Sequence, residues 1–438
     1  MTGFEGGRGV GAGDDRPPLL VVLGAGSDQR FLLQTARAMG LRTLAFDMNP
    51  QAEGAPFADR FEAISTRDVP AICGRLDALI AEGERPAGVT TMGSDIPEIV
   101  AAVAGHLGTP SVSAETARLA TDKFEMKQAF RRAGVPIPWF AAVRDARDVQ
   151  EALDTRGGRL VVKPVDRSGS RGVFLLDAGM HDRVPALFEA AQAQSFSGRV
   201  QVEDFVPGPQ YSTETVFHRG RGVTPGFADR NYEWLQRLAP RIIENGAWMP
   251  TALDAAEQAQ VDDLLARAAA ALGLADGTAK GDVVWGPDGP LLIEMAARLS
   301  GGDFCESLVP LCTGVNYVPA AIDLALGRTP DFAALTASPR QAVGNRYFIG
   351  GPGRLQAVEG LDEVARQPWI HKLELWYRPG DEVPAPVSHA HRLGVFIATA
   401  ADKAELDRRI DWVYRTVRLQ ILPSDDGDPL ADPAESAT

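Results

Sequence analysis

The sequence predicts an N-terminal α/β domain with a doubly wound parallel sheet, followed by α+β domains. Over residues 18–112, apolar strand-like runs alternate with helical patterns, which favours parallel strands covered on both faces. From about residue 113, strand-like runs instead come in pairs joined by short turns, which is typical of antiparallel hairpins. The pattern over residues 331–424 predicts a further small α+β domain.

The composition narrows the class of protein. The chain has 438 residues, 45% of them hydrophobic, and a net charge of −14, so no excess of cations is present to bind nucleic acid. No apolar run reaches the roughly eighteen residues of a membrane span. Three isolated cysteines, Cys73, Cys305 and Cys312, do not make a disulfide framework, which indicates a reducing cytoplasm.

Both ends of the chain differ from the rest. Residues 1–17 are rich in glycine and acidic residues, lack the pattern of a signal peptide, and are expected to be disordered. Residues 425–438 are expected to form an acidic tail. Order is therefore predicted to begin near residue 18.

The first strand-helix unit contains part of a dinucleotide-binding motif. Gly24 and Gly26 follow the apolar run LLVVL, and Asp47 lies at the end of the next strand, where an acid would bind a ribose. Gln29, however, occupies the third glycine position. The incomplete motif favours a doubly wound domain whose loops serve another purpose.

The functional edge of this domain should be formed by the loops that follow its strands. One of them ends in Gly93-Ser94-Asp95, directly before the helical pattern IPEIVAAVAGHLG. We expect Asp95 to cap that helix, because an aspartate before a helix often accepts hydrogen bonds from its first N–H groups.

The middle of the chain contains cations and a glycine turn. Lys123 and Lys127 lie four residues apart on a predicted helix, a spacing typical of a solvated face. Lys163 ends an apolar run, and a Ser-Gly-Ser-Arg-Gly turn precedes the next strand. Such a turn can present N–H groups to phosphate oxygens beside the lysine; the alternative is a mobile hairpin tip.

Residues 279–302 predict an antiparallel hairpin closed at Pro287 and Asp288. In such a hairpin, positions whose numbers sum to about 576 face each other, so Asp282 and Glu294 should lie roughly 5 Å apart. Two carboxylates that close repel each other unless a cation or a shared proton lies between them. The alternative is a solvated hairpin whose acids face water.

Taken in order, these stretches resemble the ATP-grasp superfamily of carboxylate–amine ligases, which work through acyl phosphates. The resemblance covers roughly residues 19–330. It implies a pre-ATP-grasp domain over 18–112 and an ATP-grasp domain of two α+β subdomains over 113–330, with a lid subdomain at about 124–204. EMAARLSGGDF and GRLQAVEGLDEV resemble the L-amino-acid-ligase and carbamoyl-phosphate-synthase-like group more closely.

The resemblance also implies the residues that bind ATP. Lys123 and Lys163 match the two family lysines, and the residue that usually binds the ribose is replaced by Gln210, so Glu214 is expected to take that role. The expected lid and hinge residues are Ser168, Gly169, Ser170, Gly172, Glu203, Asp204, Phe205 and Val206.

The hairpin acids match the metal-binding acids of the family. Asp282 and Glu294 are expected to hold two Mg²⁺ ions, with Mn²⁺ as an alternative, and Arg298 to steady the acyl phosphate. The family often has Asn two residues after its second acid, where this chain has Ala296. Candidate substrate contacts are Glu244, Gly301, Gly302 and Asp303.

The expected function is therefore ATP-dependent ligation of a small-molecule carboxylate and an amine, with dipeptide synthesis as one form of it. We expect a cytoplasmic enzyme without nucleic-acid or membrane partners, and the resemblance implies a homodimer. Alternatives are an ATP-grasp carboxylase, a nucleotide-pathway ligase, or an ATP-binding regulatory protein with a degraded site, which Gln210 and Ala296 would fit. An NAD-dependent oxidoreductase is disfavoured by Gln29.

Overall fold

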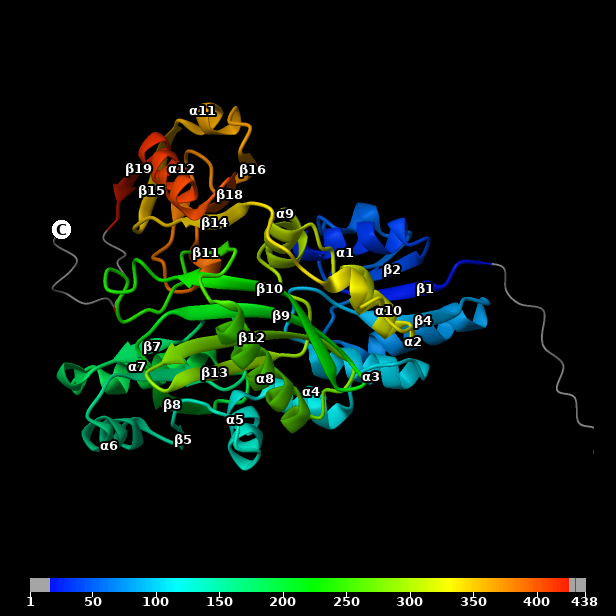
Figure 1. Cartoon of the computed structure of the whole chain (residues 1–438), viewed down its shortest axis with the longest axis horizontal. Coiled ribbons are helices and arrows are strands. Elements are labelled where there is room, and N and C mark those ends of the chain that lie inside the picture. The colour runs from blue at the N-terminus through cyan, green and yellow to red at the C-terminus, as the bar shows by residue number, and fades with distance from the viewer. Residues whose placement is uncertain (1–15, 425–429, 431–438) are drawn as a thin grey trace, which may run out of the picture.

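The computed structural model describes residues 16–424 and residue 430. The predictions for residues 1–15 and for nearly all of the acidic tail concern residues outside this described part. Within it, the strands form four sheets, which Figure 1 shows from the first domain in blue to the C-terminal segment in red. No helix among the described residues is long and apolar enough to cross a membrane.

The first sheet is parallel throughout, in the order β3-β2-β1-β4. Its strands are β1 Leu19–Leu23, β2 Arg42–Phe46, β3 Arg60–Glu62 and β4 Pro86–Thr90. Its helices are α1 Ser27–Ala38, α2 Val69–Ala81 and α3 Pro97–Leu107. Alternate residues of β1 pack toward α1 on one face and toward α2 and α3 on the other. The predicted doubly wound parallel sheet is confirmed.

A second, antiparallel sheet, here called the lid sheet, has the order β5-β8-β6-β7. It comprises β5 Phe140–Val143, β6 Leu160–Pro164, β7 Phe174–Leu176 and β8 Val200–Asp204. Its helices are α6 Ala146–Arg156 and α7 Val184–Gln194, and it is preceded by α4 Ala114–Thr121 and α5 Lys123–Arg132. The side chains of α6 and α7 close its core.

The central sheet has eight antiparallel strands in the order β13-β12-β9-β10-β11-β14-β18-β16. Its first five strands along the chain are β9 Gln210–His218, β10 Arg221–Asn231, β11 Gly246–Met249, β12 Gly277–Gly286 and β13 Gly289–Ala296. Helix α8 Ala255–Leu272 packs on β12 and β13 through an apolar stripe that includes Val261 and Leu265. A capping box of Asp254 and Glu257 begins this helix.

The C-terminal segment extends the central sheet. Strands β14 Ala342–Phe348, β16 Ile370–Leu375 and β18 Gly394–Ala400 join it through the pairing of β11 with β14. A separate three-stranded sheet contains β15 Gly353–Glu359, β17 Glu382–Val383 and β19 Arg418–Pro423, with helices α11 Leu361–Ala365 and α12 Lys403–Thr416 nearby. The mixed α+β character is confirmed, whereas the boundary at residue 331 stays a prediction.

The first sheet is joined to the central sheet by α9 Val309–Thr313 and α10 Val318–Ala325, which lie between the two in Figure 1. A short parallel bridge pairs Met92 with Leu299, and Gly93 N donates to Leu299 O at 3.0 Å. The loop after β4 is thereby fixed against the chain that leaves β13. Short helical turns cover Ala55–Phe57, Ala178–Met180, Phe304–Leu308, Ala333–Leu335 and His389–His391.

Gly281 is required by the close packing of α8 on β12. A Cβ at this position would lie 2.4 Å from Leu265 Cδ2 and 2.7 Å from Thr213 Oγ1. We expect Gly281→Ala to lower the free energy of unfolding by about 1–3 kcal/mol, because the core must shift to admit the methyl group. Urea denaturation measures the change. Gly105→Ala on α3 is the matched control, since its Cβ would meet nothing within 4 Å. Equal stability of the two variants would contradict this packing argument.

Candidate active site

A cavity of about 540 Å³ lies where the lid sheet, the central sheet, the first domain and the C-terminal segment meet. It brings together most of the residues that the sequence singled out. Those lining it are Lys123, Lys163, Ser168, Gly169, Ser170, Glu203, Asp204, Phe205, Val206, Gln210, Glu244, Asp282, Glu294, Arg298, Gly301 and Gly302. Three other predicted residues, Gly172, Glu214 and Asp303, are not among its lining residues.

The β12–β13 hairpin has the predicted register, with Asp282 opposite Glu294 and a bulge directly after Asp282. The two carboxylates make separate ion pairs. Asp282 is 5% exposed and binds Arg230 at 3.0 Å as well as Lys280, whereas the side chain of Glu294 is 32% exposed and lies 3.5 Å from Lys123. The alternative of two acids facing water is therefore wrong for Asp282.

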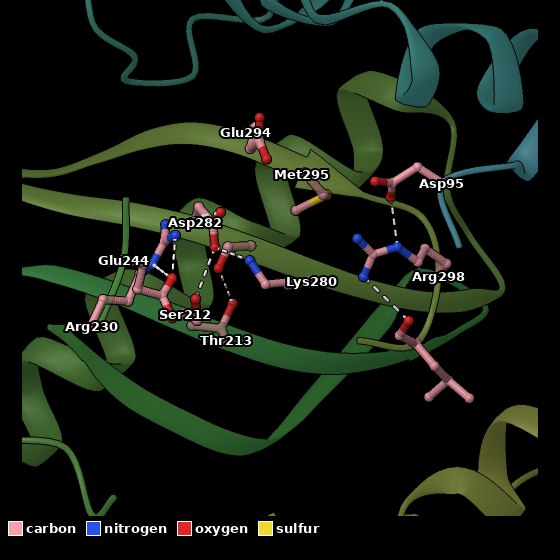
Figure 2. Close-up of polar contacts among 12 residues, drawn as sticks. Asp95, Ser212, Thr213, Arg230, Glu244, Lys280, Asp282, Glu294, Met295 and Arg298 are labelled. Carbon is pink, nitrogen blue, oxygen red and sulfur yellow. Dashed lines mark hydrogen bonds and ion pairs between the residues drawn. The ribbon is translucent and has the colours of Figure 1, made fainter. Parts of the chain in front are cut away.

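The carboxylate of Asp282 is held by three partners, shown in Figure 2. Besides Arg230 and Lys280, it accepts a hydrogen bond from Ser212 Oγ at 2.9 Å. Burial alone would raise the pKa of Asp282, but Arg230 and Lys280 hold it well below its usual range. Asp282 is thus ionised and fixed on β12.

Arg230 connects Asp282 to Glu244. Its Nε and Nη2 lie 2.9 and 2.6 Å from Glu244 Oε2, while Nη1 lies 3.0 Å from Asp282 Oδ2. Burial would lower the pKa of Arg230, but Asp282 and Glu244 raise it. Glu244 therefore lines the cavity with its carboxylate already engaged by a cation.

A buried charge triad lies at the lid-sheet end of the cavity. Lys163 Nζ and Lys127 Nζ lie 2.5 and 2.9 Å from the two carboxylate oxygens of Glu203. Burial would raise the pKa of Glu203, but the two lysines lower it. The expectation that Lys127 belongs to a solvated face is wrong, because α5 turns this side chain into the interior, where it is fully buried.

The Ser168–Gly172 turn reaches from the lid sheet to the C-terminal segment. His389 N donates to Gly169 O at 3.1 Å. The backbone of Ser170 and Gly169 is left-handed, with φ of 58° and 66°. Gly172, with φ of 71°, packs instead: a Cβ there would lie 3.0 Å from Pro164 and Gln194. Its role is therefore structural rather than lining the cavity.

Arg298 is held by Asp95 from the first domain (Figure 2), with Nε 2.6 Å from Asp95 Oδ1. The expectation that Asp95 caps α3 is wrong, because Ile96 occupies the cap position and makes no side-chain cap. The bridge between Met92 and Leu299 brings Asp95 to Arg298 instead. Burial would raise the pKa of Asp95, but Arg298 lowers it to about 2.

The glycines after Arg298 approach Asp28 on α1. Gly302 N donates to Asp28 Oδ1 at 3.1 Å, and a Cβ at Gly301 would lie 2.3 Å from Asp28 Oδ2. Burial raises the pKa of Asp28, which also lines the cavity. Sequence reasoning missed Asp28, although its place after the glycine loop was a usable signal. Asp303, by contrast, is bound by Lys372 at 2.8 Å, so its predicted contact with substrate is not supported.

The expectation that Glu214 binds the ribose needs correction. Along β9, Glu214 is four residues from Gln210, which at 3.3 Å per residue is roughly 13 Å away. It is fully buried beside Ser300 and Tyr317 and faces Arg298 from outside the cavity. Burial raises its pKa to about 7. Position along the strand thus separates Glu214 from Gln210, which lines the cavity.

The incomplete glycine motif is explained by Gln29. Its Oε1 accepts from Gly26 N at 2.8 Å, and its Nε2 donates to Met92 O, so the side chain closes the loop where a third glycine would leave space. Other lining residues carry no local sequence signal, because they reach the cavity from distant strands and turns. They are Ser212, Arg230, Asn345, Tyr347, His389 and Arg392.

The cavity wall supplies the type of ligand atom, carboxylate oxygen, that Mg²⁺ prefers. Among the described residues, no group of three or more His, Cys, Asp and Glu side chains gathers into a closed metal cage. Mg²⁺ is commonly held by one or two carboxylates together with substrate phosphates, and Asp282 and Glu294 supply such oxygens on the cavity wall. A two-carboxylate site completed by phosphates is consistent with this arrangement.

The raised pKa of Glu214 predicts a pH effect on stability. Between about pH 4.5 and 7 the unfolded chain loses this proton while the folded chain keeps it, so stability due to Glu214 falls as the pH rises. Glu214→Gln removes that fall. We expect the unfolding free energy of the variant, relative to the unaltered protein, to rise by roughly 3 kcal/mol between those pH values.

Urea denaturation at the two pH values measures this difference. Glu151→Gln, at an exposed position of α6, is the control for a general effect of removing a carboxylate. A difference for Glu214→Gln that stays constant with pH would contradict the assignment.

Two family models match the chain. The model of the ATP-grasp domain matches residues 120–302, and that of the L-amino acid ligase C-terminal domain 2 matches residues 346–421. The crystal structure of L-amino acid ligase from Bacillus licheniformis superimposes with a TM-score of 0.78 at 20% identity, covering 93% of this chain and all of that one. That likeness shows the shared fold.

Relatives in sequence include two ligases. Carnosine synthase 1 of Gallus gallus is 26% identical over 78% of this chain and 39% of its own length. D-alanine–D-alanine ligase of Pseudomonas fluorescens is 29% identical over 44% of this chain and 62% of its own length. The chain therefore spans less than two thirds of either ligase. It contains an ATP-grasp domain and an L-amino acid ligase C-terminal domain.

Proposed function

We propose that this chain joins a carboxylate to an amine through an acyl phosphate, with release of ADP and phosphate. The observation that carries the proposal is one cavity that holds the paired acids Asp282 and Glu294, the lysines Lys123 and Lys163, and Arg298. Phosphoryl transfer needs these parts: neutralised phosphate charge, and an acceptor carboxylate held in line. Cytoplasmic location and a homodimer remain predictions.

The lid-sheet end of the cavity is the proposed ATP site. The N–H groups of Asp204 and Phe205 already donate to Trp139 O and Arg159 O, so we assign the adenine edge to the backbone at Val206. Lys163 and the Ser168–Ser170 turn would contact phosphate oxygens, and Gln210 is the proposed ribose contact. This assignment places the phosphates toward the hairpin acids.

Glu294 and Asp282 are the proposed holders of Mg²⁺, two ions being the family expectation. When bound, the metal would neutralise charge on the β- and γ-phosphates. Lys123, which lies beside Glu294, adds positive charge to the same place. Burial would lower the pKa of Lys123, but Glu294 and Asp95 raise it, so its ammonium stays charged.

Arg298 is the proposed catalytic residue. Asp95 fixes its guanidinium at the cavity wall, where it can orient the substrate carboxylate and stabilise the tetrahedral species formed later. In the first step, a carboxylate oxygen bonds to the γ-phosphorus as the bond from that phosphorus to ADP breaks. In the second, the amine nitrogen bonds to the carbonyl carbon, phosphate leaves with the bonding electrons, and the amine loses a proton. The Ser168–Gly172 turn would keep water from the acyl phosphate.

The activity can be tested without knowing the amine. We expect at least one of the twenty proteinogenic L-amino acids, supplied as the carboxylate with ATP, Mg²⁺ and hydroxylamine, to give ADP and a hydroxamate detectable with ferric ion. Bicarbonate is tested in parallel, because ATP-grasp carboxylases share the fold. ADP release that depends on bicarbonate alone would favour a carboxylase and contradict the proposal.

Glu294→Ala should abolish carboxylate-dependent ADP release while the protein stays folded, because a proposed metal ligand is lost. Asp263→Ala, at an exposed position of α8, is the matched control for loss of an acid. Circular dichroism verifies folding in both variants. Turnover by Glu294→Ala at the level of the control would contradict the metal assignment.

Arg298→Lys should lower kcat/KM by about 100-fold, because a point charge cannot replace the planar fork that Asp95 positions. Steady-state ADP release measured with a coupled assay tests this. A decrease in kcat/KM of less than about threefold would contradict this prediction, because it would mean that Arg298 contributes only its positive charge.

A further inference from the structure

The C-terminal segment contributes a buried arginine to the cavity. Arg392 follows the His389–His391 turn, lines the cavity and is 8% exposed. Its Nη2 donates to the backbone oxygen of Glu244, and its guanidinium lies 3.6 Å from the centre of the Tyr347 ring. These two contacts fix the plane of the side chain.

Arg392 is buried and has no acidic partner, unlike five other cations of the cavity wall. Lys123, Lys163, Lys280, Arg230 and Arg298 each form an ion pair. No carboxylate of the described residues lies within ion-pair distance of Arg392, and its buried Nε has no hydrogen-bond partner there. A buried cation with an unused donor is unfavourable unless a ligand supplies the anion.

The position of Arg392 identifies which reactant supplies that anion. Tyr347, on which it stacks, lies against the glycine loop after Arg298: a Cβ on Gly302 would lie 3.4 Å from Tyr347 Oη. Asn345 Nδ2 donates at 3.4 Å both to Tyr347 Oη and to Gly302 O. Arg392 therefore belongs to the Gly301–Gly302 end of the cavity, whereas the proposed adenine contact is at Val206.

The neighbouring charges favour a carboxylate of the amine substrate over a phosphate. Asp28 lines this part of the cavity, so a dianion would be repelled more than a single carboxylate, and a planar carboxylate matches the guanidinium fork. Arg298 is already assigned to the reacting carboxylate. Asp28, beside Gly302, is an acid that can hold a substrate ammonium.

We propose that Arg392 is a specificity-determining residue that binds a non-reacting carboxylate on the amine substrate. The inference rests on the proposed ligase activity and deepens it, because it names a group that the amine must carry and a residue that selects it. The C-terminal segment then takes part in substrate choice as well as closing the cavity.

Matched amines test this proposal: glycine against glycinamide, and L-alanine against L-alaninamide, each with the best carboxylate from the hydroxylamine screen. We expect Arg392→Met to raise KM for glycine and L-alanine at least 50-fold and to change KM for the amides less than threefold. Arg392→Lys should give an intermediate KM. Coupled product is quantified by mass spectrometry, and ADP release is followed in parallel.

Arg346→Met is the control for loss of a buried arginine. Arg346 is 3% exposed and stacks over Trp248, but it is not among the residues that line the cavity. The Arg346→Met substitution should change KM for glycine and KM for glycinamide to the same extent. Thermal unfolding of both variants verifies that they are folded.

Hydroxamate formation separates the two proposals, since hydroxylamine carries no carboxylate. If Arg392→Met forms hydroxamate normally but its KM rises equally for glycine and glycinamide, the proposal for Arg392 is overturned while the ligase activity stands. An unaltered protein that does not prefer the amino acids to their amides overturns it as well. If Arg392→Met instead raises KM only for acid substrates that carry a second carboxylate, Arg392 contacts the acid substrate and not the amine. That result would also overturn the proposal. Absence of hydroxamate with every carboxylate in the unaltered protein would overturn the ligase activity itself.

Discussion

The cavity depends on buried charges that are stable because they are paired. Asp282 is held by Arg230 and Lys280, Glu203 by Lys163 and Lys127, and Arg298 by Asp95. Removing one member of such a pair leaves an uncompensated buried charge, which typically costs about 3–5 kcal/mol. These pairs therefore fix side chains before any ligand binds, which is the preorganisation that phosphoryl transfer requires. Arg392 departs from the rule, which is why it points to a ligand.

The same pairs join parts of the chain that are far apart in sequence. Arg298 and Asp95 connect the central hairpin to the first domain, and the hydrogen bond from Gly302 to Asp28 makes a second connection there. His389 connects the C-terminal segment to the turn at Gly169. Four parts of the chain line the cavity, and each contributes polar groups to it.

Local patterns in the sequence predicted much of this arrangement. The turn position predicted the pairing of Asp282 and Glu294 only to within one residue: positions near the turn sum to 575, and the bulge after Asp282 shifts the sum to 576 and brings Asp282 opposite Glu294. Local spacing failed where a tertiary contact decides: Lys127 is buried against Glu203, and Asp95 binds Arg298 rather than capping a helix. Glu214 shares a strand with Gln210 but lies beyond the cavity. Arg230, Tyr347 and Arg392 carry no motif, since only the pairing of β10, β11 and β14 and the turn before β18 bring them together.

The central claim is that a carboxylate bound in this cavity takes the γ-phosphoryl group of ATP. Positional isotope exchange tests it most directly. ATP labelled with ¹⁸O in the β–γ bridge is incubated with the enzyme, Mg²⁺ and the carboxylate, without an amine, and the bridge label is followed by ³¹P NMR. The account predicts that the label moves into the non-bridging β positions when the carboxylate is present, because acyl phosphate and bound ADP re-form ATP. Scrambling that does not depend on the carboxylate would contradict the account. So would its absence under conditions in which the complete reaction, with an amine, releases ADP.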